Sequence, residues 1–173
     1  MKKIFITGIS GTGKTTIYEE LVKRDYYAIS LDETDDLCCW VNRETKERVH
    51  RHVELNRDFT SQHQWICDIE YLKQLINIDK EIVFILGSAS NQDQFLNLFN
   101  KILLLQCKPE VFIERLNTRT NNDFGKHKTV QDHLLTWYEK FENKLIEEGA
   151  ISINTDKQIG EVVDEVLKQA LLK

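Results

Sequence analysis

The sequence predicts an α/β fold in which helices cover both faces of a parallel sheet. The first observation is a glycine-rich segment at residues 8–15, which stands between an apolar run and a helical pattern. The second is a pair of continuously apolar runs at residues 82–86 and 102–105, typical of parallel strands buried on both faces. The third is the alternation of strand-like and helix-like patterns along the whole chain, which favours parallel strands joined by helices.

The glycine-rich segment reads GISGTGKT and fits the spacing G-x-x-x-x-G-K-[ST] of a phosphate-binding loop, or P-loop. Its flanks agree with this interpretation, because residues 3–7 predict a strand and residues 16–23 predict a helix. Glycines let backbone N–H groups approach a polyphosphate closely, and the start of the helix adds a positive dipole end. The motif therefore predicts a site for a nucleoside triphosphate.

Each position of this loop has an expected role. Lys14 should reach the β- and γ-phosphates of ATP, and the hydroxyl of Thr15 should ligate Mg²⁺. Thr16 is expected to contact the α-phosphate. The predicted nucleotide-binding residues of the segment are Gly8, Ser10, Gly11, Thr12, Gly13, Lys14, Thr15 and Thr16.

Composition fits a single globular domain, residues 1–173, with one core. A formal net charge of −5 argues against a broad nucleic-acid-binding face. No run is long enough to cross a bilayer and the N-terminus does not resemble a signal peptide, so a cytoplasmic protein, monomeric or homodimeric, is expected. The four cysteines lack metal-ligand spacing and are expected to be reduced thiols.

A second strand is expected at residues 26–31, and acidic residues follow it at once. In open α/β sheets the ligand lies beyond the carboxyl ends of the strands, so these carboxylates should face the phosphate site. Asp32 is the first candidate and Asp35 the second. Each is expected either to hold Mg²⁺, a role favoured for Asp32, or to accept the proton of an attacking hydroxyl, and Asp35 is also a candidate contact to the acceptor. The alternative is an acidic loop facing solvent.

Residues 37–63 have the weakest pattern of the chain and are expected to form an insertion that covers the acceptor. Four arginines in or next to this segment are candidates for holding an acceptor phosphate: Arg43, Arg48, Arg51 and Arg57. Three histidines lack a carboxylate or cysteine partner at metal-binding spacing and are expected at the surface: His50, His52 and His63.

Apolar side chains recur at helical spacing over residues 65–76 and predict a helix. A strand at residues 81–86 then ends in a polar turn that contains a glycine. The glycine permits close approach, and the polar side chains suit a base or a sugar, although a helix cap is an equally good explanation of them. The candidate acceptor-binding residues of this turn are Gly87, Ser88, Asn91 and Gln92.

Residues 101–107 predict another buried strand, and Pro109 stands where a first helical residue is expected. On the following helix, Arg115 and Arg119 are four residues apart and should project from one face. The polar, glycine-containing residues 117–129 are expected to form a lid over the transferring phosphates. Both arginines would then stabilise the transferring charge, and Arg115 would also contact the nucleotide; the alternative is an exposed helix end with surface salt bridges.

The last third of the chain continues the alternation. Thr129 to Asp132 have the form of a capping box that starts a long helix, and Gly149 fits the C-terminal cap of that helix. Residues 150–153 predict the final strand. Asn154 and Thr155 follow at its carboxyl end, where they are expected to touch the nucleotide, and an amphipathic helix ends the chain.

On these residues the chain resembles the small P-loop kinases, the group that includes nucleoside monophosphate kinases and shikimate kinase. The resemblance implies a P-loop NTPase fold with three α/β/α layers and a five-stranded parallel sheet in the order 2-3-1-4-5. It also implies ATP with Mg²⁺ as donor, closure of the lid and a phosphorylated small molecule as product. The features that carry it are GISGTGKT, Asp32 and Asp35 after the second strand, the turn at Gly87, Arg115 and Arg119 with their lid, and Asn154 with Thr155.

Two departures leave the acceptor open. The turn after the third strand lacks the arginine that adenylate kinases carry, and Asp32 and Asp35 are three residues apart, whereas the shikimate kinase pattern spaces two aspartates by one residue. The expected function is ATP-dependent transfer of the γ-phosphoryl group to a nucleotide, a nucleoside or a small hydroxylated metabolite. The alternative is a nucleotide-binding NTPase or regulatory protein without such an acceptor. A switch is disfavoured because the apolar runs at residues 82–86 and 102–105 are followed by Gly87 and Gln106 and not by an aspartate.

Overall fold

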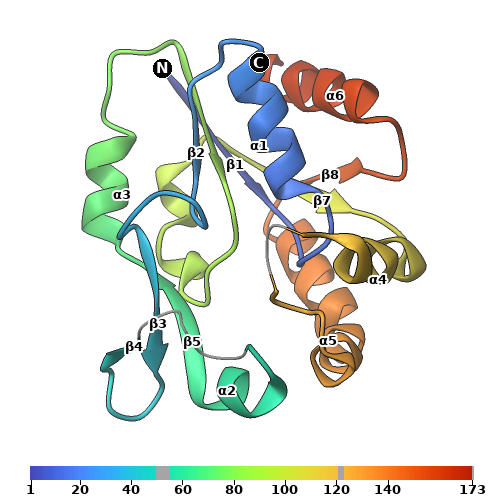
Figure 1. Ribbon diagram of the computed structural model, residues 1–173. Helices are drawn as coiled ribbons and strands as arrows, with labels where there is room; N and C mark the ends of the chain where they lie inside the picture. The colour runs from blue at the N-terminus through green and yellow to red at the C-terminus, as the bar shows by residue number, and fades with distance from the viewer. Residues whose placement is uncertain (50–54, 121–122, 173) are drawn as a thin grey trace.

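The computed structural model describes residues 1–49, 55–120 and 123–172 and has a parallel sheet at its centre (Figure 1). The sheet order is β2-β6-β1-β7-β8, and every strand pairs with its neighbours in parallel. Counted along the chain within this sheet, the order is 2-3-1-4-5, as predicted. Its strands are β1 (Lys2–Thr7), β2 (Ala28–Ser30), β6 (Ile82–Leu86), β7 (Lys101–Gln106) and β8 (Ile151–Asn154).

Helices pack on both faces of this sheet, which confirms the predicted α/β/α layers (Figure 1). The helices are α1 (Lys14–Lys23), α3 (Ile69–Leu75), α4 (Pro109–Thr118), α5 (Lys128–Glu147) and α6 (Ile159–Leu171). In β1, Ile4 is buried against α1 and α6, whereas its neighbour Phe5 is buried in the cluster that includes α3. This follows from the strand itself, because successive side chains point to opposite faces.

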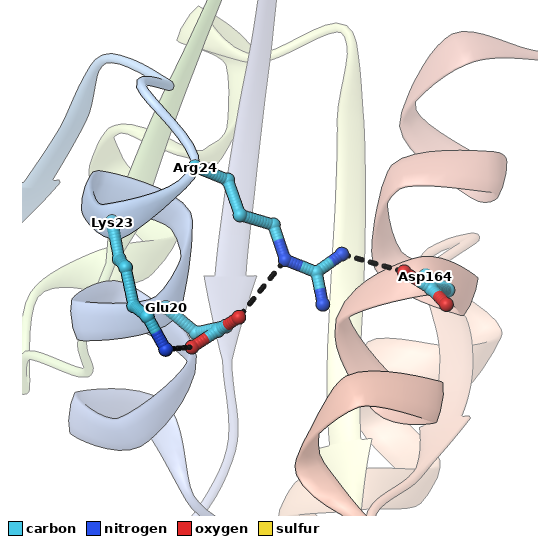
Figure 2. Close-up of polar contacts among 4 residues, drawn as sticks. All are labelled: Glu20, Lys23, Arg24 and Asp164. Carbon is cyan, nitrogen blue, oxygen red and sulfur yellow. Dashed lines mark hydrogen bonds and ion pairs between the residues drawn. The ribbon is translucent and has the colours of Figure 1, made fainter.

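Arg24 joins α1 to α6, the two helices that cover the same face of the parallel sheet (Figure 2). Its Nε donates to Glu20 at 3.0 Å, and its Nη1 donates to Asp164 of α6 at 2.5 Å. These ion pairs are partly exposed, so water screens them and they add little to the stability of the fold. The apolar contact between α1 and α6, through fully buried residues such as Leu21 and Val166, therefore dominates this face.

A second, smaller sheet lies at the end of the molecule opposite the two termini (Figure 1). It has three antiparallel strands in the order β4-β3-β5, and Trp40 lies directly opposite Trp65 in the β3–β5 pair. Most of this sheet and the short helix α2 (Arg57–Gln62) lie within residues 37–63, the segment with the weakest sequence pattern. The strands are β3 (Cys38–Asn42), β4 (Arg48–Val49) and β5 (His63–Cys67).

The predicted helix over residues 65–76 is wrong at its beginning. Trp65 lies in β5, and α3 begins only at Ile69. The side chain of Asp68 accepts a hydrogen bond from Tyr71 N at 3.0 Å and so caps the helix at that point. Before the cap, pairing with β3 holds the chain extended, which overrides the apolar spacing.

Two further details differ from the predictions. The long helix α5 has His127 at its N-cap without a side-chain cap bond, so the capping box expected at residues 129–132 does not form. Instead, Gln131 Nε2 donates to Gly125 O at 2.9 Å and fixes the end of the lid to the helix. Arg119 is the C-cap of α4 with extended backbone, so it does not share a helical face with Arg115.

Two expectations about helix ends are confirmed. Pro109 opens α4, and Gly149 follows the end of α5 with φ 93°. The four cysteines are free thiols, with Cys38 and Cys67 opposite each other across β3 and β5. Within residues 1–49, 55–120 and 123–172, no helix is both long and apolar enough to span a bilayer.

Gly87, at the end of β6, is explained by packing against the residue that follows β2. A Cβ atom added at Gly87 would lie 2.4 Å from Leu31 Cβ, and Leu31 is fully buried. The sequence predicted that this glycine permits a close approach. The group that approaches Gly87 is the side chain of Leu31, directly after β2. Glycine is needed here for the fold.

The Gly87→Ala variant should lose about 1–3 kcal/mol of unfolding free energy, because overpacking forces buried groups to move. Urea denaturation would measure this loss. Gly160→Ala is the matched control, since the nearest atom to its added Cβ is an Arg24 guanidinium nitrogen at 4.0 Å. Equal stability of Gly87→Ala and the wild type would contradict this account of Gly87.

Candidate active site

The loop between β1 and α1 forms one end of the site. Its last residue before the helix, Gly13, has φ 100° and serves as the N-cap of α1 without any side-chain hydrogen bond. Glycine suits this position because other residues rarely adopt a positive φ. The first backbone N–H groups of α1 therefore have no side-chain cap, which is the arrangement that binds an anion.

Lys14 lies within this loop. Its Nζ donates to Gly8 O at 2.7 Å and to Ile9 O at 3.0 Å. Burial lowers the pKa of Lys14 from its ordinary value to about 8, and the nearby charge of Asp32 opposes that shift. The ammonium group thus lies where phosphate oxygens would be held.

Two arginines reach the loop from α4 and its end. Arg115 donates to Thr155 through two nitrogens, at 3.2 Å to Oγ1 and 2.8 Å to the carbonyl oxygen. Arg119 donates to Ser10 Oγ at 3.2 Å and to the carbonyl oxygen of Phe124 in the lid. Burial lowers the pKa of Arg119, and the charge of Asp32 opposes this shift. Arg115 therefore ties the loop after β8 to α4, and Arg119 ties the lid to the phosphate loop.

These groups line one cavity of about 930 Å³, a volume typical of small-ligand sites. The cavity extends from the phosphate loop to the three-stranded sheet, the lid and α5. The predicted site residues that line it are Gly8, Ser10, Gly11, Thr12, Gly13, Lys14, Thr15, Thr16, Asp32, Ser88, Gln92, Arg115, Arg119 and Thr155.

Four predicted site residues do not line the cavity: Asp35, Gly87, Asn91 and Asn154. Asp35 is exposed, and Asn154 accepts a hydrogen bond from the backbone of Asp156 at 2.8 Å. The Asn91 side chain bonds both backbone groups of Cys67, at 3.0 and 2.9 Å. Asn91 therefore joins β5 to the turn after β6.

The structure adds residues at the acceptor end that the sequence did not single out. Trp40, Trp65 and Phe124 line the cavity from β3, β5 and the lid. His63 also lines it and stacks on Phe59 at 4.1 Å between ring centroids, so it is not the simple surface histidine that was expected. The tryptophans of β3 and β5 were visible in the sequence, but their pairing across the sheet was not.

The arginines of the insertion separate into different groups. Arg43 and Arg57 line the cavity. Arg48 instead pairs with Asp36 at 2.6 Å on the surface. Arg51, His50 and His52 lie outside the described residues. Among the described arginines of this segment, the structure therefore brings Arg43 and Arg57 to the cavity.

The donor set fits ATP with Mg²⁺. The Thr15 hydroxyl and the Asp32 carboxylate line the same cavity as Lys14, and Mg²⁺ prefers oxygen ligands of this kind. Within the described ranges, no group of three or more histidine, cysteine or acidic residues could hold a metal ion by itself. Mg²⁺ at nucleotide sites commonly takes one or two protein ligands and completes its shell with phosphate and water.

The sequence profile of the AAA domain family, AAA_18, matches residues 4–147. The chain belongs to this AAA domain family. The matched region begins in β1 and ends with α5, so this AAA domain includes the phosphate loop, the three-stranded sheet and the lid.

Several proteins similar to this chain over nearly its whole length are named as kinases. A shikimate kinase from Bacillus cytotoxicus is 27% identical over 176 residues, covering 98% of each chain. The structure of TT1252 from Thermus thermophilus matches with a TM-score of 0.62 at 19% identity, over 98% of this chain and 96% of the other. A deoxyadenosine kinase from M. mycoides matches with a TM-score of 0.57 at 15% identity, over 96% and 98%. The sequence likeness to shikimate kinases agrees with the predicted resemblance to small P-loop kinases, and the structural likenesses show that the fold is shared.

The lowered pKa of Lys14 predicts proton uptake on nucleotide binding. With a pKa of about 8, about half of the unliganded molecules carry a neutral Lys14 at pH 8. A bound triphosphate raises this pKa, so ATP binding at pH 8 should take up about half a proton through Lys14, and almost none at pH 6.5.

Calorimetric titration in buffers of different ionisation enthalpy would measure this uptake. The Lys14→Arg variant is the control, because its guanidinium stays charged and should abolish the uptake at pH 8. An uptake near zero for the wild type at pH 8 would contradict the assignment.

Proposed function

We propose that this chain transfers the γ-phosphoryl group of ATP to a small-molecule acceptor. The observation that carries the proposal is that Lys14, Asp32 and Arg119 line one cavity with the acceptor-side sheet. The full-length relatives named as shikimate kinases support phosphotransfer in general. Among the fold neighbours, one is named for a nucleoside and another for shikimate, so these names do not define the acceptor.

The donor end binds and orients ATP. Backbone N–H groups at the start of α1 and the ammonium of Lys14 hold the phosphates, and the hydroxyl of Thr15 with the carboxylate of Asp32 would hold Mg²⁺. The bound metal supplies positive charge that offsets the charge developing on the phosphoryl oxygens. Thr155, held by Arg115, lies beside the loop and is the candidate contact to the rest of the nucleotide.

When the substrate is a hydroxyl compound, Asp32 is the proposed proton acceptor, as the alternative to its role at Mg²⁺. Its charge acts on both Lys14 and Arg119, which indicates that the carboxylate lies near the transferring group. Asp35 is exposed and lies outside the cavity lining, so we favour Asp32 for this role. An acceptor that is already ionised, such as a phosphate, needs no base.

Residues 37–63 and 117–129 are the proposed acceptor cover and lid. Arg119 links Ser10 of the phosphate loop to the Phe124 carbonyl of the lid, so closure of the lid and placement of this guanidinium occur together. A guanidinium fixed by two such contacts suits the charge that develops during transfer. Exclusion of water by the closed lid would limit hydrolysis of ATP.

The direct test is a screen with Mg²⁺ and ATP against nucleosides, nucleoside monophosphates, sugars and small hydroxy acids. We expect ADP release together with a phosphorylated acceptor, measured by mass spectrometry. Lys14→Ala should lower this turnover by about 100-fold or more at an unchanged unfolding midpoint. Binding of ATP with no phosphorylated product from any acceptor would support the regulatory alternative and overturn the proposal.

Arg119→Ala should lower kcat by roughly 100-fold while the Kd for ATP changes much less, because its charge acts mainly in the transition state. Arg119→Lys keeps the charge without the planar fork and should recover part of the rate. Steady-state kinetics and equilibrium titration with ATP separate the two quantities. Equal losses in kcat and in affinity would contradict a transition-state role.

A further inference from the structure

The acceptor end of the cavity is built largely from aromatic rings. Trp40 is the centre of the group, with ring centroids 5.4 Å from Trp65, 5.2 Å from Phe59 and 6.4 Å from Phe124. Trp40, Trp65 and Phe124 line the cavity. Phe59 is buried and packs edge to face on Trp40. We call Trp40, Trp65 and Phe124 the aromatic wall.

The wall comes from separate parts of the chain. Trp40 and Trp65 are paired across β3 and β5, and Phe124 arrives from the lid. The ring planes of Trp40 and Phe124 are inclined to each other by 31°. The lid therefore adds a ring face that is tilted moderately from the Trp40 ring. Ring faces of this kind favour a flat aromatic ligand, which stacks on them.

Two polar features accompany the wall. The indole Nε1 of Trp65 is buried and has no hydrogen-bond partner among the described residues. An unpaired buried donor is costly, so an acceptor atom supplied by a ligand or an ordered water would stabilise it. Arg43 and Arg57 line the same end of the cavity and suit an anionic group on the ligand.

Resting on the proposed phosphotransfer, we infer that the acceptor carries a planar nitrogen heterocycle that packs against the aromatic wall, as in a nucleoside or a nucleoside 5′-monophosphate. Stacking would orient the ring, and the remainder of the acceptor would extend toward Asp32 and the transferring phosphoryl group. Ser88 and Gln92, which also line the cavity, offer polar contacts between the two ends. Trp40 and Trp65 are on this view specificity residues.

The test compares kcat/KM for nucleosides and their 5′-monophosphates with that for shikimate and simple sugars, at saturating ATP. We expect kcat/KM for a heterocyclic acceptor to be higher than kcat/KM for every acceptor without an aromatic ring. Trp40→Leu should raise its KM about tenfold or more, and Trp40→Phe should recover most of the loss. The Kd for ATP should stay within about twofold, since the phosphate loop is unchanged.

Tyr26→Leu is the matched control. It removes an aromatic ring that packs edge to face on Phe84, 5.7 Å away on the α1 side of the parallel sheet, and should leave KM for the acceptor unchanged. Should Trp40→Leu fail to fold, Trp65→Phe keeps one six-membered ring and removes the pyrrole ring with its Nε1–H, and it should still raise KM.

The arms of the test distinguish the possible failures. Preferred phosphorylation of shikimate or a sugar, unaffected by Trp40→Leu, would overturn the inference and leave the proposed phosphotransfer standing. No phosphorylated product from any compound would overturn the proposed function itself. Arg57→Gln then separates the two heterocyclic acceptors, because it should raise KM for the monophosphate and not for the nucleoside.

Discussion

A partly buried positive charge at an uncapped helix start is the constraint on which the rest of this structure depends. Lys14 lies beside the backbone of the phosphate loop, and its Nζ donates hydrogen bonds to the carbonyl oxygens of Gly8 and Ile9. Burial makes this charge unfavourable, as the lowered pKa of Lys14 records. An anion that also meets the N–H groups of α1 relieves both problems at once, so the loop is most favourable when a polyphosphate occupies it.

The other elements place chemical groups around that anion site. The parallel sheet brings the end of β1, Asp32 in the segment after β2, and the loop after β8 to the same edge of the sheet. The three-stranded sheet closes the opposite end of the cavity. Contacts from Ser10 to Arg119, from Arg119 to Phe124, and from the Phe124 ring to Trp40 then connect the two ends. The lid thus contacts both ends of the cavity through Arg119 and Phe124.

The donor half could be predicted from the sequence because its signal is local. The glycine and lysine spacing, the apolar strands and Pro109 each report on a few neighbouring residues, and the sheet order came from the family resemblance. The acceptor half could not, because it depends on pairing between residues far apart in the chain. Trp65 fitted a helical stripe as well as a strand, and only the β3–β5 register shows that it faces Trp40. Asn91 had the chemistry of a ligand contact, yet its amide is used by the backbone of Cys67.

The small sheet leaves and rejoins the main body of the protein at adjacent points. Cys38 and Cys67 face each other where it begins and ends, and Asp68 N donates to Leu37 O at 2.8 Å beside them. A segment with neighbouring ends can be exchanged as one unit, provided that the Asn91 bonds to Cys67 and the contact of Trp40 with Phe124 are kept. Exchange of residues 38–67 between related proteins would therefore give chimaeras in which one end of the cavity is altered and the phosphate loop is inherited unchanged.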